Sequence, residues 1–425
     1  MPPFAGSNGI HHDSSSNIVT IDVGGQLFQT TKQTLSLAGS KSFFSKIANS
    51  DQAIPFVDRD PELFSILLSL LRTGNLPSKA KAFDIQDLIF ESQFYGIENL
   101  LLNSQSNPSQ FDAFNLEKSF VLPLSGRDSP SAISTTPCGS LHVAHGSKVT
   151  SFDWSLQRKS TILTQFTAID SLLALSPAVA AAGATDFSGL QILDLDKGFV
   201  KDTLNWENVT RSGSTVQAIG TSPEHLFTSF ESTIPATKLQ WVPSHNLLMA
   251  SGSHSGPSGV SGNIKFWDIR SGNVVWELKE KVDCFSDVTV SDVLGTMFKV
   301  GVNTGEVFCA DLRNMDADHP WVCLGDGRKV INGKKEGFGC KVESQGNQVF
   351  CSKGGNVELW SEILLGTVEK QETGLHERVF RKNLMGRAKD MGGNRITNVN
   401  FGGSKMFLTR KDQQCVEVWS SVRSF

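Results

Sequence analysis

A charged triplet, Asp58-Arg59-Asp60, precedes a leucine-rich segment that runs to Arg72, and this spacing suits two kinds of chemistry. A guanidinium matches a carboxylate in a bidentate pair, so Arg59 and Arg72 could each bind an acidic group on a neighbouring molecule. The alternative is local, with Asp60 capping a helix and the triplet forming ion pairs within one chain. These residues therefore favour assembly or folding over catalysis.

Catalytic and metal-binding patterns are missing from the sequence. It has no Gly-x-Ser-x-Gly, His-Glu-x-x-His or paired-carboxylate pattern, so nothing indicates a nucleophile or an acid–base pair. Gly24 and Gly25 lack the rest of a phosphate-binding loop and predict a tight turn. His142 and His145 point to opposite faces of a strand, with no residue spaced to complete a metal site. The sequence thus predicts no enzyme, no cofactor and no metal.

One basic run, residues 376–395, could bind an anion. Its candidate contact residues are Arg378, Arg381, Lys382, Arg387 and Lys389. A loop of this composition could hold an acidic peptide or a phosphate. The alternative is a charged loop that is solvated and has no partner. We name the run the candidate substrate-binding loop.

Composition limits the classes of partner. The 425 residues include 39 Lys plus Arg and 43 Asp plus Glu, a net charge of -4 that gives no long-range attraction to nucleic acid. No apolar run reaches the roughly 18 residues of a membrane span, and residues 1–17 have the composition of a disordered tail. The seven cysteines contain no Cys-x-x-Cys pair and predict reduced thiols. We expect a soluble protein of the cytoplasm or nucleus that binds neither nucleic acid nor membrane.

Residues 18–102 alternate strand and helix patterns and predict an α+β domain. The runs 18–23 and 26–31 are short β-type segments joined by two glycines, the signal for a tight hairpin. Phe43 and Phe44 follow in a helical segment and cannot both face one core. Either one of them is exposed for a partner, or both are buried between packed helices.

Capping residues define the helices of this domain. Asp60 suits the N-cap, Pro61 the first helical position and Gly74 the stop, with leucines between them at three- and four-residue steps. A second helical region, 84–101, is interrupted at Gly96. It predicts two short helices.

Residues 103–120 are rich in Asn, Ser and Gln and predict a linker, whereas residues 121–425 carry a repeat. A phrase of alternating apolar residues recurs, and its final residue lies at Asp153, Asp194, Asp268, Asp311, Ser361 and Ser420. The steps are 41, 74, 43, 50 and 59 residues, and the 41- and 43-residue steps match the roughly 40–45 residues of a four-stranded propeller blade. The 74-residue step hides a degenerate unit at 218–232. We therefore predict an all-β propeller with seven blades.

Two further features belong to this repeat. Three tryptophans occupy equivalent positions in the phrase and are expected to fill the space between blades: Trp267, Trp360 and Trp419. The basic run lies in the 59-residue step before the last phrase, so we expect an insertion that projects from the propeller.

The first domain resembles the BTB/POZ domain of the potassium-channel tetramerisation type. The matching motifs are IDVGG (21–25), Phe28, Thr30-Thr31, Thr34-Leu35, DRDP (58–61), Phe64, ILLSLLRTGNLP (66–77) and FYGI (94–97). The second domain resembles WD-repeat propellers more loosely, through the pair Trp267-Asp268. The order of domains is similar to that of plant BTB/POZ proteins with a WD-repeat-like propeller.

The resemblance implies self-association through the BTB domain and an adaptor role. Such adaptors link a cullin-3 ubiquitin ligase to a protein substrate held by the second domain. The oligomerisation and partner-binding residues that follow are Asp58, Arg59, Asp60, Arg72, Phe43 and Phe44. The sequence departs from the pattern in having no cysteine before Cys138 for an interfacial zinc site. It also leaves no room for the helical extension that many cullin-binding BTB proteins carry.

Two alternatives stay open. The chain could be an oligomeric scaffold that clusters propeller-bound partners without ubiquitination. It could also be a propeller enzyme, which predicts titratable side chains that converge on the central channel. The substrate and the size of the BTB oligomer do not follow from the sequence.

Overall fold

The chain divides into two compact units, residues 1–105 and residues 106–425. The computed structural model describes residues 18–50, 52–106, 111–205, 215–230, 236–256, 259–281, 283–315, 320–325, 336–363, 379–385 and 393–421. The predicted tail at 1–17 lies outside these residues. Among the helices in the described ranges, none is both long and apolar enough to cross a membrane.

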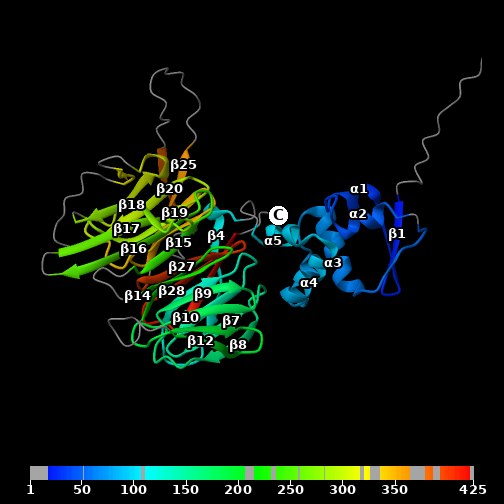
Figure 1. The fold of residues 1–425 in the computed structure, drawn as a ribbon, viewed down its shortest axis with the longest axis horizontal. Coiled ribbons are helices and arrows are strands. Elements are labelled where there is room, and N and C mark those ends of the chain that lie inside the picture. Colours follow the sequence, from blue (N-terminus) through cyan, green and yellow to red (C-terminus); the bar gives the residue numbers. More distant parts are fainter. Residues whose placement is uncertain are drawn as a thin grey trace, which may run out of the picture. The chain divides into compact units, whose positions relative to one another are not determined.

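The N-terminal unit packs a small sheet against helices (Figure 1). Its strands are ordered β2-β1-β3 and are β1 (Ile18–Val23), β2 (Gln26–Thr31) and β3 (Phe56–Val57). Its helices are α1 (Lys32–Ser36), α2 (Phe43–Ala48), α3 (Pro61–Thr73), α4 (Ile85–Tyr95) and α5 (Glu98–Ser106), with a 3-10 helix at Ser78–Ala82. The predicted α+β class is confirmed.

The hairpin of β1 and β2 turns on two glycines, as predicted. Val23 pairs with Gln26, so only Gly24 and Gly25 form the loop, at φ values of 56° and 88°. These left-handed conformations are unstrained only for glycine. A Cβ on Gly24 would also lie 2.6 Å from the carbonyl oxygen of Arg59, so the turn packs closely on the segment before α3.

Helix α3 begins and ends where its capping residues predict. One carboxylate oxygen of Asp60 accepts hydrogen bonds from the backbone N–H of Glu62 and Leu63, at 2.8 and 2.9 Å. Gly74 closes the helix at φ 71°. Between them α3 buries seven apolar side chains: Leu63, Phe64, Ile66, Leu67, Leu68, Leu70 and Leu71. The helix is the core of the unit.

The break at Gly96 is also confirmed. It ends α4 at φ 74°, and a Cβ there would lie 3.1 Å from the Cα of Ser42. The next helix, α5, continues to Ser106 and so enters the segment 103–120 that the sequence predicts as linker. The structure moves the start of that segment because α5 still buries Leu101 against the N-terminal unit.

Six four-stranded sheets and one two-stranded sheet form the described part of the C-terminal unit (Figure 1). The first sheets contain β5 (Pro130–Thr135), β6 (Leu141–His145), β7 (Lys148–Phe152), β8 (Arg158–Leu163); β9 (Ser171–Ser176), β10 (Val179–Gly183), β11 (Leu190–Asp194), β12 (Phe199–Leu204); and β13 (Val216–Thr221), β14 (Leu226–Phe230). Every one of these pairings is antiparallel.

The remaining sheets follow the same up-and-down order. They contain β15 (Lys238–Val242), β16 (Leu247–Gly256), β17 (Gly259–Asp268), β18 (Asn273–Glu280); β19 (Phe285–Ser291), β20 (Thr296–Gly301), β21 (Val307–Asp311), β22 (Val322–Cys323); β23 (Val342–Gln345), β24 (Gln348–Lys353), β25 (Asn356–Ile363), β26 (Val379–Leu384); and β27 (Ile396–Gly402), β28 (Lys405–Arg410), β29 (Cys415–Ser421) with β4 (Leu116–Pro123). Short 3-10 helices lie at Ala113–Asn115 and Leu312–Asn314.

The recurring sequence phrase is the third strand of a sheet in all six cases. The strands that carry it are β7, β11, β17, β21, β25 and β29. This strand has a hydrogen-bonded neighbour on each side, and its residues range from mostly buried in β29 to alternately buried and half-buried in β17. The predicted degenerate unit at 218–232 coincides with the two-stranded sheet β13–β14.

The first strands of the sheets form a closed ring. β5 contacts β9, and contacts continue through β13, β15, β19, β23 and β27 back to β5. A closed ring of antiparallel sheets is the arrangement of a β-propeller, so the predicted fold class of this unit is confirmed. Seven stays a prediction of the blade number, since only two strands of the sheet containing β13 lie among the described residues.

The last sheet is completed by a strand from the start of the unit. β4 pairs with β29 from Leu116 opposite Ser421 to Pro123 opposite Cys415. The sequence places the propeller start at 121, which is wrong, because Leu116 is already fully buried in the core of this sheet. The polar composition of the preceding residues hid a strand whose partner lies at the other end of the unit.

Side-chain amides on the first strands bind the backbone of neighbouring sheets. Gln240 on β15 donates from Nε2 to the carbonyl oxygen of Val290 at 2.7 Å and accepts from its N–H at 2.9 Å. Asn400 on β27 accepts from Thr135 Oγ1 at 2.8 Å and donates to the carbonyl oxygen of Ile133 at 3.3 Å. These contacts supply partners that a strand edge otherwise lacks.

Two of the three repeat tryptophans fill the space between sheets as predicted. Trp360 is 2% exposed among residues of β20, β21 and β24, and Trp419 is 0% exposed among residues of β24 and β28. Trp267 differs, because it is only half-buried and lines a groove beside β14.

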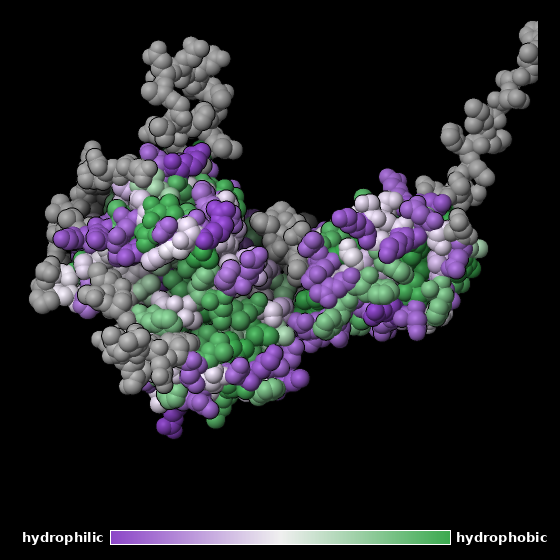
Figure 2. All heavy atoms as spheres, in the orientation of Figure 1, coloured by the Kyte–Doolittle hydropathy of each residue, from purple (hydrophilic) through white to green (hydrophobic). Residues whose placement is uncertain are grey.

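Apolar residues beside the sheet of β13 and β14 are also partly exposed. Leu173 and Leu175 on β9 pack against Val216 and Ile219 but stay partly exposed. Figure 2 shows hydrophobic residues gathered on the propeller around β9 and β10.

Two buried histidines lie on β6. His142 Nδ1 is 3.1 Å from Ser151 Oγ, and His145 Nε2 is 2.8 Å from Thr150 Oγ1. Because Thr150 and Ser151 are consecutive on β7, the two rings point to opposite faces of the sheet, as the sequence predicts. Burial, with a smaller effect of Lys159, lowers the pKa of His142 to about 3. The ring is therefore neutral near pH 7.

We expect the tryptophan positions to differ in their effect on stability. Trp419→Ala removes a fully buried ring and should lower the free energy of unfolding by about 3–5 kcal/mol. Trp267→Ala, at the half-buried equivalent position, should cost clearly less. All eight tryptophans lie in the C-terminal unit, so urea unfolding followed by tryptophan fluorescence reports that unit. Equal losses of unfolding free energy in the two variants would contradict the different burial of Trp419 and Trp267.

The stability of the propeller should fall with acid because of His142. Its pKa lies below the ordinary value of 6.5, so its contribution is present above pH 6.5 and is lost as the pH falls toward 3. Between pH 7 and pH 5, wild type should lose about 2 kcal/mol more free energy of unfolding than His142→Asn, which cannot titrate. His225→Asn, at an exposed position, should keep the wild-type pH slope. A wild-type slope in His142→Asn would refute this role.

Candidate interaction surfaces

Arg59 is held within the N-terminal unit. Its Nη1 lies 3.3 Å from Glu91 Oε1 on α4, and its guanidinium carbon lies 4.0 Å from the ring centroid of Phe94. Burial raises the pKa of Glu91, and Arg59 opposes that rise. Removing Arg59 would leave a buried carboxyl group without its cation, so this arginine has a folding role within one chain.

The other charged residues of the segment separate in space and role. Asp60 caps α3, and Asp58 is exposed. Arg72 Nη2 donates to the carbonyl oxygen of Gln29 at 2.7 Å and so covers part of the edge strand β2. Arg59 and Arg72 thus contact different elements, and their use in assembly remains a proposal.

Phe43 and Phe44 have different surroundings. Phe44 is fully buried, and its ring stacks on Tyr95 at 4.8 Å. Phe43 is half-buried, with its ring centroid 4.9 Å from that of Phe94. Of the two alternatives, the structure has one ring in the core and one at the surface.

Phe43 belongs to a larger exposed cluster, which we name the α4 aromatic surface and define by Phe43, Arg59, Phe90 and Phe94. Phe90 is 62% exposed and Phe94 37% exposed, one helical turn apart on α4. Sequence reasoning missed Phe90 and Phe94. The available signal was their spacing, since Leu88, Ile89 and Ser92 already supply the buried face of the helix.

A second exposed surface lies on the sheet. Asp22 pairs with Leu27 on one side and with Phe56 on the other, so the three side chains share one face. Leu27 is 60% and Phe56 61% exposed, and Ile18 lies on the same face of β1. We name Ile18, Leu27 and Phe56 the sheet surface. The sequence analysis did not select them, although exposed leucine and phenylalanine at paired positions mark a binding face.

The candidate substrate-binding loop is partly a strand. Arg381 and Lys382 lie on β26, the fourth strand of its sheet, so their placement in a projecting loop is wrong. Phe380 beside them is buried, and this contact holds the segment in the sheet. Arg378, Arg387 and Lys389 lie outside the described residues.

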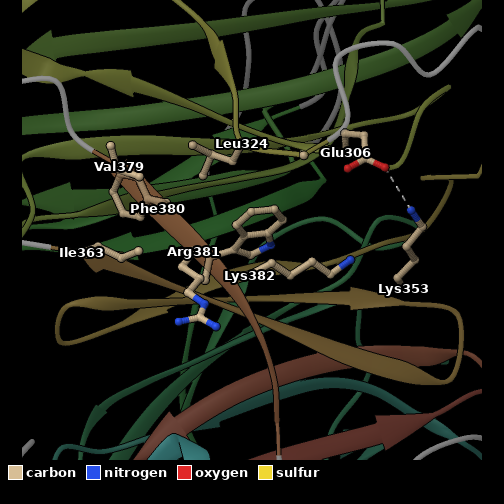
Figure 3. Close-up of a pocket in the computed structure, with 10 residues that line it drawn as sticks. Glu306, Leu324, Lys353, Ile363, Val379, Phe380, Arg381 and Lys382 are labelled. Atoms are coloured by element: carbon tan, nitrogen blue, oxygen red, sulfur yellow. Dashed lines mark ion pairs between the residues drawn. The ribbon is translucent and has the colours of Figure 1, made fainter. Parts of the chain in front are cut away.

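Both strand residues line a cavity of about 700 Å³ between the sheets of β22 and β26. Figure 3 shows the apolar side chains of Leu324, Ile363, Val379 and Phe380 on one side and the Glu306–Lys353 ion pair on the other. Lys382 lies between the two groups, whereas the Arg381 side chain extends away from them.

Three charged side chains meet on the innermost strands. Lys238 Nζ on β15 lies 2.6 Å from Glu343 Oε1 on β23 and 3.4 Å from Asp287 Oδ1 on β19. Burial opposes the charge of Lys238, but the two carboxylates outweigh it and raise the pKa of Lys238. Burial also raises the pKa of Glu343. A propeller enzyme is expected to bring titratable side chains together at the central channel. This cluster is a convergence of that kind.

The hydrogen bonds of this cluster nevertheless fit a structural clamp. Lys238 Nζ also lies 3.4 Å from the carbonyl oxygen of Val342, so each of its three donors has an acceptor nearby. Asp287 accepts the N–H of Val342 at 3.0 Å and that of Val288 at 2.9 Å. We interpret the cluster as a link between three sheets.

The described part of the chain contains no candidate site for metal binding or thiol chemistry. No group of three or more His, Cys, Asp or Glu side chains there is arranged to hold a metal ion. All seven cysteines carry free thiols, and five are buried. Burial raises the pKa of Cys351 well above its ordinary value, which disfavours the reactive thiolate.

Comparison with known proteins covers both units. Residues 19–105 match a BTB/POZ domain family, and residues 206–421 match the family described as At2g24240-like, C-terminal beta propeller. The Arabidopsis thaliana BTB/POZ domain-containing protein At5g41330 is 58% identical over 96% of both chains. A second Arabidopsis protein, At4g30940, is 24% identical over 96% of this chain and 98% of its own. A third, At2g24240, is 36% identical over 35% of this chain and 34% of its own. The chain therefore belongs to the family of BTB/POZ domain-containing proteins with a C-terminal β-propeller.

Proposed function

We propose that this protein is a substrate adaptor of a cullin-3 ubiquitin ligase. Its BTB domain self-associates and docks cullin-3, and its propeller binds a protein substrate in the cytoplasm or nucleus. The observation that carries the proposal is the BTB/POZ domain with two exposed apolar surfaces, joined in one chain to a propeller. The adaptor acts by proximity, since it raises the concentration of substrate near the ligase.

The sheet surface is assigned to self-association. Its exposed leucine and phenylalanine would bury apolar area in a contact between copies, and burial of about 100 Å² of apolar surface contributes roughly 2.5 kcal/mol. The nearby edge strand β2 is partly covered by Arg72, which favours face-to-face contact over strand pairing.

The α4 aromatic surface is assigned to cullin-3. Aromatic rings and arginine dominate the binding energy of many interfaces. Here Phe94 packs on both Phe43 and Arg59, so the surface is already ordered before a partner arrives.

The alternative is a scaffold that clusters propeller-bound partners without ubiquitination. It keeps the sheet surface and the propeller but has no use for cullin-3. Because the two functions share self-association, only the cullin-3 contact separates them.

Self-association should depend on the sheet surface. Leu27→Asp places a charge in the apolar contact, and the mass of the full-length protein measured by light scattering should fall toward that of one chain. Leu37→Asp is the matched control, because Leu37 is 65% exposed on the neighbouring helix segment. An unchanged mass for Leu27→Asp would place the contact elsewhere.

Cullin-3 binding should depend on the α4 aromatic surface. In a pull-down with the purified N-terminal region of cullin-3, wild-type protein should bind at micromolar concentration. Phe90→Ser should weaken binding at least tenfold, since it removes an exposed aromatic contact without opening the core. Phe114→Ser, at an exposed position of the C-terminal unit, is the control. No binding by wild type would reject the ligase function and leave the scaffold.

A further inference from the structure

The cavity between the sheets of β22 and β26 has an unbalanced charge. Four of its lining residues are charged, and three of them are cations: Lys353, Arg381 and Lys382 against Glu306. Lys353 Nζ lies 3.6 Å from Glu306 Oε1, and Lys382 Nζ lies 2.6 Å from Glu358 Oε1. Within the described ranges, Arg381 has no ion-pair partner. Arg381 therefore lines the cavity without a carboxylate partner among the described residues.

The rest of the wall is apolar and ordered. Phe380 and Trp360 are buried parts of the core between two sheets, so they hold the floor of the cavity in place. Leu324, Ile363 and Val379 are only partly covered and offer apolar surface in the cavity that Arg381 also lines. Of these three side chains, Figure 3 shows Ile363 nearest to Arg381.

A buried donor in the wall also lacks a partner. Trp360 is 2% exposed, and its Nε1–H has no hydrogen-bond acceptor in the described part of the chain. Lys382 Nζ lies 5.8 Å from the centroid of this ring. A buried indole N–H ordinarily finds an acceptor, so this donor is an unsatisfied polar group within the described part of the cavity wall.

We infer that this cavity binds an acidic segment of a partner protein, in which a carboxylate lies beside an apolar side chain. The inference rests on the proposed function and specifies the substrate segment that the propeller recognises. The carboxylate pairs with Arg381, and the apolar side chain packs on Leu324, Ile363 and Val379. One arginine that has no ion-pair partner among the described residues suits one carboxylate, whereas phosphorylated motifs are usually bound by clusters of arginines.

The first test selects peptides without assuming their sequence. Random twelve-residue peptides displayed on phage are panned on immobilised full-length protein, in wild type, Arg381→Glu and Lys279→Glu. Lys279 is the matched control, because it is an exposed cation on β18, the fourth strand of another sheet. Wild type and Lys279→Glu should enrich peptides with Asp or Glu within two positions of Leu, Ile or Phe. Enrichment of the same peptides by Arg381→Glu, or no enrichment of acidic residues, overturns the inference.

The second test measures coupling between the arginine and the selected carboxylate. By fluorescence polarisation, Arg381→Ala should weaken binding of the best peptide about tenfold, the effect of one charge-assisted contact. Replacing the peptide's acidic residue by its amide should weaken wild type equally but change Arg381→Ala less than about twofold. If the arginine substitution and the amide substitution instead weaken binding by independent factors that multiply, the carboxylate binds elsewhere. Ile363→Ala should weaken binding with the salt dependence unchanged, because it removes only apolar contact.

Neither test contains cullin-3 or ubiquitin. Peptide binding with no cullin-3 binding would keep the cavity as the partner site of a scaffold. Cullin-3 binding with no acidic peptide selected would keep the ligase adaptor and reject this cavity as its substrate site.

Discussion

The pairing of β4 with β29 is the contact on which the propeller depends. Each propeller sheet buries its faces only against its neighbours, so an open row of sheets would expose two apolar faces. β4 comes from the start of the unit and completes the last sheet. Beside it, buried Arg410 binds Glu417 through Nε–Oε1 at 3.0 Å and Nη2–Oε2 at 3.2 Å, and also donates to the carbonyl oxygen of Gly355 in the preceding sheet. The closed ring then fixes the outer strands that line the cavity.

Local signals predicted much of the fold, because caps and turns act over a few residues. Asp60, Gly74 and Gly96 end or begin helices where their chemistry requires, and the repeat phrase marks the third strands. Strand pairing between distant parts of the sequence could not be predicted in the same way. β4 is exposed over most of its length and has its partner at the far end of the unit, so composition alone predicted a linker. Likewise β22 has only two residues and carries no pattern to detect.

The interaction residues were harder to predict, since burial decides their role. Arg59 could equally pair with a neighbour or with its own chain until α4 places Glu91 3.3 Å away. Phe43 and Phe44 are adjacent, yet packing against Tyr95 selects Phe44 for the core. For Arg381, charge density suggested a loop, but the buried side chain of Phe380 holds the segment as a strand. In each case a tertiary contact overrode the local pattern.

The proposed cavity and the proposed self-association can be related through binding affinity. One charge-assisted contact and a small apolar wall give a modest affinity, because such a contact contributes about 1.5–3 kcal/mol and part of that is offset by ordering the peptide. Self-association would present several cavities on one assembly, so a substrate with repeated acidic segments would be held by more than one of them. A substrate with a single segment would gain nothing from the assembly. Weak single sites joined by an oligomer therefore favour multivalent partners, and selectivity comes from the number of segments as much as from the fit of each.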